Sequence, residues 1–456
     1  MNTTEELAPA ALGTPAPPST ATGATGVTRV MGVYRTERRK LTAQMAPRAL
    51  ALVCVLGPFA FAAMMQSQSG SPSDTIFGVW VHTSGFAIPL VVLAFAGAWG
   101  FPVLAGVLGG DLFSAEDRYG TWKMILTRSC RRRDLFVGKA LAAATFSVGL
   151  IALLAVSGLA AGLLFVGDQP LVGLGGTLLA PGTCIALVLA AWLTGVLPMF
   201  GFASLAMLLS AATRNGIAGV LGTILVALVM QLLALVGTGT WVHALLLASA
   251  FDGWHGLFTA HPFYSALLVS SIVSVAWIVA CLTATWAIIR RRDFAGTPTS
   301  RRPGWGTPIR AVLLTATLVA VLAVASSWGP PAVTAARLTY SIAPTFSNLT
   351  LLEQRLVGRT GETTTNLKLL AHCARRSGTS RGPGDDWYCT VVALIAQPGV
   401  VPFWGTPVTY DVSVQSNGCY KAEAPPTSVG NLLMRDAHRQ LVVNPLATIY
   451  GCFNTL

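Results

Sequence analysis

The amino-acid sequence predicts an α-helical polytopic membrane protein with about seven transmembrane helices, followed by a small α+β domain. Of its 456 residues, 53% are hydrophobic and only 11% are charged, whereas soluble domains average about 25% charged residues. The apolar residues form charge-free runs, and a run of about 20 residues is long enough to cross the hydrocarbon core of a bilayer as a helix. Residues 329–456 are more polar and charged and hold four of the eight cysteines.

Seven charge-free runs are predicted to cross the membrane. The uncharged stretch 169–213 is too long for one helix, and the Pro and Gly residues of its first part favour a loop, so its helix begins near Thr183. The predicted spans are 49–66, 86–109, 140–166, 183–210, 217–236, 264–289 and 311–328.

Lysine and arginine are confined to alternate segments between these spans. Residues 1–48 hold six basic residues, residues 111–139 hold seven, the connection at Arg214 holds one, and residues 290–310 hold six. The segments between them, 67–85, 167–182 and 237–263, hold no lysine or arginine. Because positively charged loops stay inside, we expect a cytoplasmic N-terminus in a multi-pass protein of the cell membrane, with residues 329–456 extracytoplasmic. The net charge of +12 thus reflects topology, and no nucleic-acid partner is predicted.

The segments outside the spans differ in composition. Residues 1–28 are mostly Ala, Thr, Pro and Gly and are predicted to be a disordered tail. Residues 29–48 interleave six basic residues with apolar ones, which favours a cytoplasmic interfacial helix; the alternative is a flexible basic segment held by membrane lipids. Residues 290–310 are predicted to be a cytoplasmic basic linker to the seventh span.

The cysteines of residues 329–456 predict two disulfides, because this domain is placed outside the cell membrane. Proximity in the sequence favours Cys373–Cys389 and Cys419–Cys452. Three connectivities are possible, and buried free thiols are the alternative.

Secondary-structure signals predict a small α+β fold for residues 329–456. Residues 408–415 alternate apolar and polar side chains and lead into Asn417-Gly418, a strong hairpin signal. Residues 386–396 are predicted to be a second strand, and residues 344–376 are predicted to be helical.

The segment 111–139 is the most highly charged connection between the predicted spans. It carries seven basic and four acidic residues, which alternate with anchoring side chains such as Phe113, Tyr119 and Trp122. This pattern is typical of a short amphipathic helix that lies against a membrane face and is presented to a partner.

Several kinds of chemistry are missing from the sequence. There is no GxxxxGK[ST] phosphate-binding loop, HExxH, CxxC or GxSxG motif, so no catalytic residue is predicted. The predicted spans contain no Asp, Glu, Lys, Arg or His in their interiors, which counts against a secondary carrier. The spacing of His82, His243, His255 and His261 matches no standard metal site, and no metal is predicted.

A loose motif in the segment 111–139 carries a resemblance to a known family. It consists of Glu116-x-x-x-Gly120-Thr121, Leu126, Ser129, Arg132 or Arg133, Leu135 and Gly138-Lys139. The motif resembles the loop between the second and third spans of the permease subunits of type-2 ATP-binding-cassette exporters. Residues 29–289 resemble that family's arrangement of a basic entering helix, six spans and a long loop after the fifth.

The resemblance implies a permease subunit of a bacterial ATP-driven exporter, which works by alternating access together with a second permease copy or a paralogue. A coupling helix in the loop 111–139 would dock into a separate ATPase subunit. The ATPase would bind the ATP, so the chain itself is expected to need no cofactor and to be no enzyme. Carried over to this sequence, the coupling residues are Glu116, Gly120 and Thr121, with Arg118 and Tyr119 beside them. The apolar spans suggest a hydrophobic or amphipathic substrate.

The seventh span and the C-terminal domain depart from the six-span pattern of that family. They keep a second function open, a non-transporting membrane scaffold that displays the domain to an extracellular partner. The amphiphilic loop 237–263 is similar to the family's re-entrant helices, although an aromatic belt at the lipid interface explains Trp241 and Trp254 equally well. The pairs Gly106/Gly110 and Gly158/Gly162 permit close helix packing.

Overall fold

The computed structural model describes residues 26–127 apart from 69, 71 and 73, together with 131–235, 243, 245–292, 333–359, 367–395 and 403–455. Within these residues, six helical segments are long and apolar enough to cross a membrane. Their bounds are Met45–Ser67, Ala87–Gly110, Arg132–Phe165, Pro181–Thr213, Gly216–Ala234 and Ser265–Arg291. They match the first six predicted spans in order, whereas the predicted seventh span, 311–328, lies outside the described residues.

Two of the six segments are interrupted. The second consists of α3 (Ala87–Phe95), a π-helical turn η2 (Ala96–Gly100) and α4 (Phe101–Gly110). The fourth consists of α8 (Pro181–Thr194) and α9 (Val196–Thr213), which are separated by Gly195. The uninterrupted helices are α2 (Met45–Ser67), α7 (Arg132–Phe165), α10 (Gly216–Leu235) and α12 (Ser265–Arg291).

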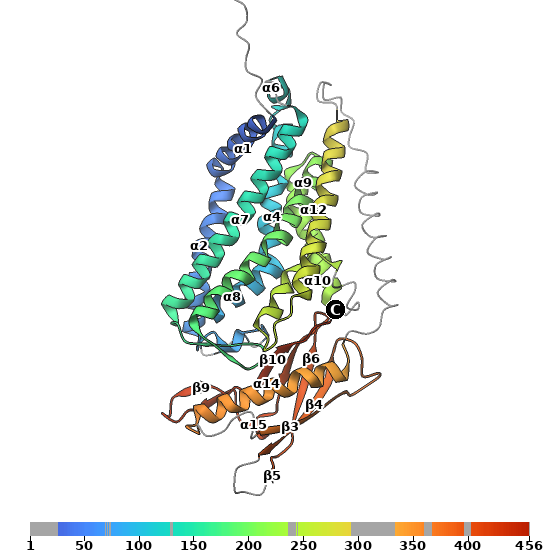
Figure 1. The fold of residues 1–456 in the computed structure, drawn as a ribbon. Coiled ribbons are helices and arrows are strands. Elements are labelled where there is room, and N and C mark those ends of the chain that lie inside the picture. The colour runs from blue at the N-terminus through green and yellow to red at the C-terminus, as the bar shows by residue number, and fades with distance from the viewer. Residues whose placement is uncertain are drawn as a thin grey trace, which may run out of the picture.

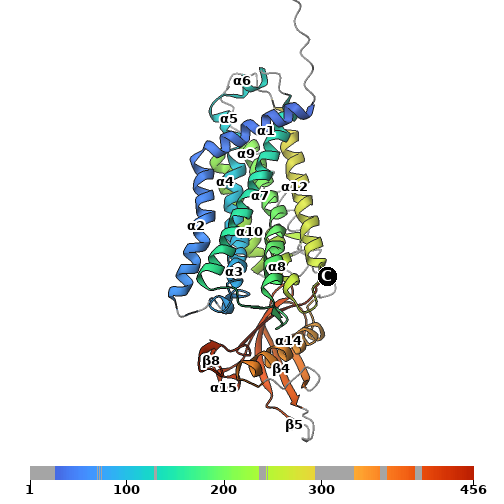
Figure 2. The same ribbon diagram turned by 60° about the vertical axis from the view of Figure 1, so that its left-hand side comes forward.

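Helix α1 (Gly26–Ala43) lies across one end of the bundle, and the C-terminal domain lies at the opposite end (Figures 1 and 2). We call these the α1 end and the domain end. The extended backbone of Gln44 lets the chain turn from α1 into α2. The predicted tail 1–28 reaches too far, because residues 26–28 are already helical and Arg29 pairs with Asp134 of α7 at 3.3 Å.

Helix α7 begins at Arg132, well before the predicted start of the third span at residue 140. The helix therefore runs through Asp134 and Lys139, although the sequence suggested that charged residues would end it. Both side chains are buried and ion-paired. Neutralisation by these partners lets the helix continue through its charged first turns.

Glycines bring the helices of the bundle into close contact, as the predicted small-residue pairs allow. A Cβ on Gly110 of α4 would lie 2.9 Å from the backbone nitrogen of Val220 in α10. A Cβ on Gly162 of α7 would lie 2.0 Å from the carbonyl oxygen of Gly85, just before α3. Any larger side chain at these positions would force the helices apart.

Connections at the domain end fold back onto the bundle. They include η1 (Gly78–Trp80), the hairpin of β1 (Leu171–Val172) and β2 (Leu178–Leu179), and η3 (Ser249–Phe258). Trp254 and Phe258 of η3 are almost fully buried and pack against Phe77. These two aromatic residues therefore pack within the protein rather than in a lipid-facing belt, while Trp241 lies outside the described residues.

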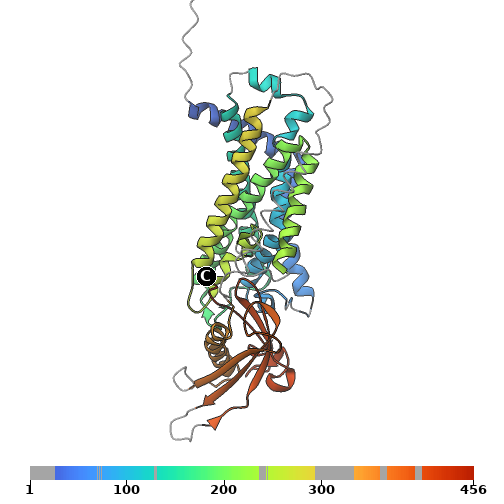
Figure 3. The ribbon, with the colours of Figure 1, turned by 90° about the vertical axis from the view of Figure 1, so that its right-hand side faces the viewer.

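The C-terminal domain combines helix α14 (Ala335–Leu356) with an antiparallel sheet of order β10-β7-β6-β4-β3 (Figure 3). The strands of this sheet are β3 (Leu367–Arg375), β4 (Gly384–Ile395), β6 (Val408–Val414), β7 (Cys419–Glu423) and β10 (Thr448–Cys452), and short β5 (Phe403–Trp404) pairs with β4. A second hairpin, β8 (Leu433–Arg435) and β9 (Leu441–Val443), follows the short helix α15 (Pro426–Val429). The predicted strands 386–396 and 408–415 are confirmed.

The predicted helix 344–376 is wrong in its second half, because residues 367–375 form β3. Leu367, Leu369, Ala371 and Cys373 alternate with other residues, and β3 pairs with β4 along its whole length. Helix α14 covers one face of the sheet, and its Ile342 and Phe346 pack with Tyr410 in the domain core.

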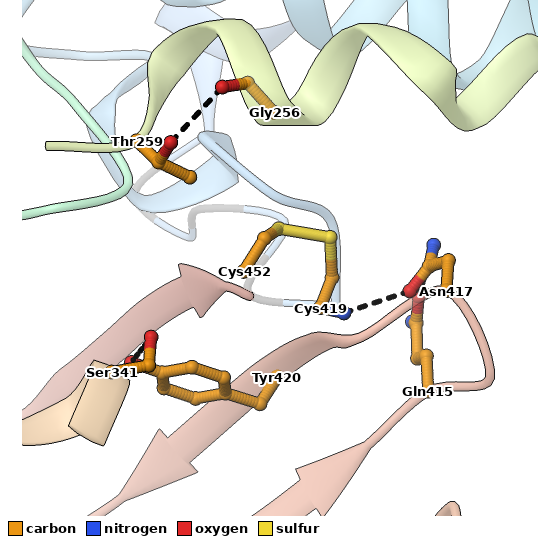
Figure 4. The surroundings of a disulfide bond; sticks show 8 residues. All are labelled: Gly256, Thr259, Ser341, Gln415, Asn417, Cys419, Tyr420 and Cys452. Carbon is orange, nitrogen blue, oxygen red and sulfur yellow. Dashed lines mark hydrogen bonds between the residues drawn. A yellow bond between two sulfur atoms is a disulfide. The ribbon is translucent and has the colours of Figure 1, made fainter. Parts of the chain in front are cut away.

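Both predicted disulfides are confirmed. Cys373 bonds to Cys389, and Cys419 bonds to Cys452. Each bridge joins residues that lie directly opposite each other on neighbouring antiparallel strands. Figure 4 shows the Cys419–Cys452 bridge beside Tyr420, whose hydroxyl lies 3.2 Å from that of Ser341 in α14.

The domain packs directly on the domain end of the bundle. The Asn348 amide of α14 donates to the carbonyl of Gly175 at 2.7 Å. The Ser265 hydroxyl, at the first residue of α12, donates to the Asn454 side chain at 2.8 Å. Cys419 and Cys452 belong to the same apolar cluster as the membrane helices. The domain and bundle thus share part of their core.

Candidate functional site

The predicted coupling residues lie at the α1 end, on two short helices, α5 (Ser114–Arg118) and α6 (Trp122–Thr127). Gly120 joins them with φ of 65°, a left-handed conformation that favours glycine. Arg118, Tyr119 and Gly120 are exposed, and Thr121 is partly exposed. Tyr119 is 70% exposed, a high value for an aromatic side chain. The α5–α6 tip therefore presents four of the five predicted residues to solvent.

Glu116, the fifth predicted residue, points into the protein instead and is only 3% exposed. Its Oε1 atom accepts from Lys139 Nζ of α7 at 2.9 Å and from Lys40 Nζ of α1 at 2.8 Å. Lys139 also donates to Glu37 Oε1 at 2.8 Å and to the Leu112 carbonyl at 2.7 Å. The partner of this carboxylate is therefore in the same chain, where the sequence suggested a group on another subunit.

These four side chains form a charge-balanced buried ion cluster, which we call the Lys139 cluster (Glu37, Lys40, Glu116 and Lys139). Lys139 is fully buried, and all three of its N–H donors have an acceptor. Burial alone would raise the pKa of Glu116, but the ammonium groups of Lys139 and Lys40 outweigh it and hold that pKa below its usual value. The cluster thus ties α5 to α1 and α7 with charged hydrogen bonds.

Asp117, the next residue of α5, points to the other side of the bundle. It forms an ion pair with Arg292 at the end of α12 and accepts from Trp122 Nε1 at 2.9 Å. The Arg292 guanidinium lies over the Trp122 ring, 5.8 Å from its centre. Burial lowers the pKa of Arg292, and Asp117 acts against this effect. Two consecutive acids therefore hold one short helix to different helices of the bundle, Glu116 to α1 and α7 and Asp117 to the end of α12.

The end of α12 receives a second cation. The Arg132 guanidinium, at the start of α7, donates to the carbonyls of Arg290 and Arg292 at 2.9 Å each. The last carbonyls of a helix have no partner within the helix and carry partial negative charge. Arg132 therefore satisfies them and fixes α12 beside the α5–α6 tip.

The sequence motif around Gly138-Lys139 has a clear structural cause. A Cβ on Gly138 would lie 2.6 Å from the Val33 side chain, so glycine is needed where α1 crosses α7. Lys139 then reaches the carboxylates of α1 and α5. Glu37, Lys40 and Arg292 were missed by sequence reasoning. One signal in the sequence could have indicated such partners: Lys139 precedes a long apolar run, and a lysine buried there needs a nearby acidic side chain to neutralise it.

An amphipathic groove of about 500 Å³ adjoins the Lys139 cluster, between α1, the start of α2, α4 and α10. Its charged lining residues are Glu37, Lys40, Asp111 and Arg118. Its apolar walls come from residues such as Val107 and Leu221, and Leu221 is 59% exposed. The groove can therefore contact both a charged head and an apolar tail.

No group of three or more His, Cys, Asp or Glu side chains suited to a metal ion occurs among the residues that the structure describes. His243 and His255 line a small cavity with Asp252 at the domain end. Burial lowers the pKa of His255 to about 3 and raises the pKa of Asp252 to about 7. Near neutral pH this histidine is uncharged.

A comparison with protein families identifies a family for this chain. The family described as "Protein of unknown function (DUF2705)" matches residues 52–295. The chain belongs to this family. The DUF2705 segment begins within α2, ends just after α12 and includes the α5–α6 tip. The C-terminal domain lies outside the DUF2705 segment. No curated protein matches the chain.

Proposed function

We propose that the chain is the membrane-spanning permease subunit of an ATP-driven exporter, and that the α5–α6 tip docks into a separate ATPase subunit. One observation carries the proposal. The tip exposes Arg118, Tyr119 and Gly120, while the adjacent acids Glu116 and Asp117 fix it to α1, α7 and α12. A firmly held, exposed tip can pass a rigid-body displacement on to the spans.

In this proposal Glu116 acts inside the permease and does not touch the ATPase. Its carboxylate holds α5 against Lys139, so a push on the tip acts on α7 and α1 directly. Arg118 and Tyr119 supply the contact surface. Arg118 also pairs with Asp111 at 3.0 Å, in an exposed ion pair that contributes little to stability.

The proposed cargo is hydrophobic or amphipathic. The groove beside the Lys139 cluster supports this proposal, because it combines charged and apolar walls. Apolar side chains of α2 and α10, such as Leu52, Leu56 and Leu225, are exposed, and both helices border this groove. They support pairing with a second permease copy or a paralogue across this face.

The proposed orientation places the α1 end in the cytoplasm of a bacterial cell and the domain outside. We expect a membrane-impermeant thiol reagent to miss Arg131→Cys in intact cells and to label it after permeabilisation, in a Cys130→Ser background. Leu441→Cys in β9, 64% exposed at the domain end, should be labelled in intact cells. Labelling of Arg131→Cys without permeabilisation would reverse the orientation.

The proposal predicts that a cassette ATPase is encoded beside this chain, and the coupling role is tested with that ATPase. We expect Tyr119→Ala to weaken co-purification of the ATPase at least about 30-fold, because buried aromatic anchors at interfaces contribute about 2 kcal/mol or more. The matched control is Tyr340→Ala, which removes a tyrosine that is 82% exposed at the domain end. Equal ATPase binding by the two variants would remove the tip from the proposal, and consistent absence of such an ATPase gene would favour a membrane scaffold.

A further inference from the structure

A second groove, of about 630 Å³, lies between α14 and the domain end of the bundle. Its walls come from α14, the residues after η3, the β1–β2 hairpin and the end of β10. The hydrogen bond from Ser265 to Asn454 places it level with the first residue of α12, where that apolar helix begins. The groove therefore lies at the boundary between the proposed bilayer and the outer domain.

The formal charge in the lining of this groove is positive. Arg337 of α14 lines it, and its guanidinium donates to the Asn454 carbonyl at 3.2 Å. His261 lines it as well, and no carboxylate does so among the described residues. The charged residues that line a different groove are Asp74, Asp385, Glu423 and a single cation, Lys421. Of these two grooves, only the one at α14 favours an anion.

Apolar side chains line part of this groove, and others are exposed in the first turns of α12. Phe263 and Pro344 line the groove, and the Tyr340 ring is exposed at its rim. Nearby on α12, Leu268 and Ile272 are 63% and 59% exposed, four residues apart on one helix face. Tyrosine favours the boundary between lipid and water. A ligand with an anionic head and an apolar tail would complement both the positive charge of the groove and its apolar side chains.

We propose that this groove binds the phosphate head of an anionic phospholipid from the outer leaflet, with Arg337 as the principal phosphate contact. Arginine forms charge-assisted hydrogen bonds to phosphate oxygens, and His261 adds an N–H donor. The lipid would lie between α14 and α12 and tie the outer domain to the bilayer. This site is independent of the ATPase and of any transported cargo.

The test measures lipid binding to the purified full chain in detergent by native mass spectrometry. We expect phosphatidylglycerol to bind more tightly than phosphatidylcholine, and Arg337→Gln to weaken phosphatidylglycerol binding about tenfold. The matched control is Arg355→Gln, which removes an exposed arginine from the last turn of the same helix. Equal effects of the two variants, or equal binding of the two lipids, would overturn the proposal.

A second variant keeps the test decisive if Arg337→Gln does not fold. Tyr340→Glu places a carboxylate at a position of the rim that is 82% exposed, so we expect the variant to fold and to reduce phosphatidylglycerol binding at least as strongly. Tyr340→Phe should bind normally. Displacement of the lipid by millimolar inorganic phosphate would show a site for free phosphate and would overturn the lipid as occupant.

Discussion

Lys139→Met is expected to destabilise the protein by about 3–5 kcal/mol, the cost of removing one partner from a buried ion pair. The ammonium group is fully buried and bonds to Glu37, Glu116 and the Leu112 carbonyl. Methionine would fill a similar volume but leave two carboxylates with a single neighbouring cation, Lys40. We expect a lower denaturation midpoint for the detergent-purified protein and increased protease cleavage between α1 and α7.

Arg133→Met is the control, because this exposed residue lies in the first turn of the same helix. It should unfold as the wild type does. The triple variant Lys139→Met, Glu37→Gln, Glu116→Gln should regain much of the loss, since it leaves no unpaired acid in the cluster. A midpoint for Lys139→Met equal to that of Arg133→Met would contradict the ion cluster.

Removal of the Cys419–Cys452 bridge is expected to cost about 3–4 kcal/mol, from the loop that it closes. The paired Ser variant should lower the unfolding midpoint of the domain within the full chain. The sequence separation is 33 residues here and 16 for Cys373–Cys389, so loop entropy predicts a somewhat smaller loss for the second pair. Because Cys419 and Cys452 also pack with the membrane helices, their loss should expose the seam between domain and bundle to protease.

Mass mapping without reductant provides the check on the wild-type protein. We expect both bridges to form in the protein isolated from the membrane. If all four thiols of the domain are free, the domain is in a reducing compartment, and the orientation and the count of spans must change with it.

The first six predicted spans match apolar helices of the structure because hydrocarbon imposes a strong and local rule. A helix that crosses the bilayer needs a long run without unpaired charge, and such runs are visible in one segment at a time. The disulfide pairing could also be predicted from the sequence, because Cys373–Cys389 and Cys419–Cys452 each join neighbouring antiparallel strands. Sequence proximity then agrees with spatial proximity.

The inward direction of Glu116 could not be predicted, because its partners are distant in the sequence. Lys139 is 23 residues away and Lys40 is 76 residues away. The motif placed Glu116 correctly in a loop at the α1 end, but only the crossing of α1 over Gly138 brings the cations to it. Similarly, the predicted helix 344–376 includes the residues of β3, because short apolar runs are compatible with both a strand and a helix.

Helix α12 is attached at both of its ends. At the α1 end, Arg292 pairs with Asp117, and Arg132 donates to the last carbonyls of α12. At the other end, Ser265 donates to Asn454 of the C-terminal domain. A helix of 27 residues is about 40 Å long. We expect α12 to move as a rigid body, so that a shift along its axis at one end moves the other end by the same distance. The C-terminal domain is thereby linked mechanically, through α12, to the α5–α6 tip.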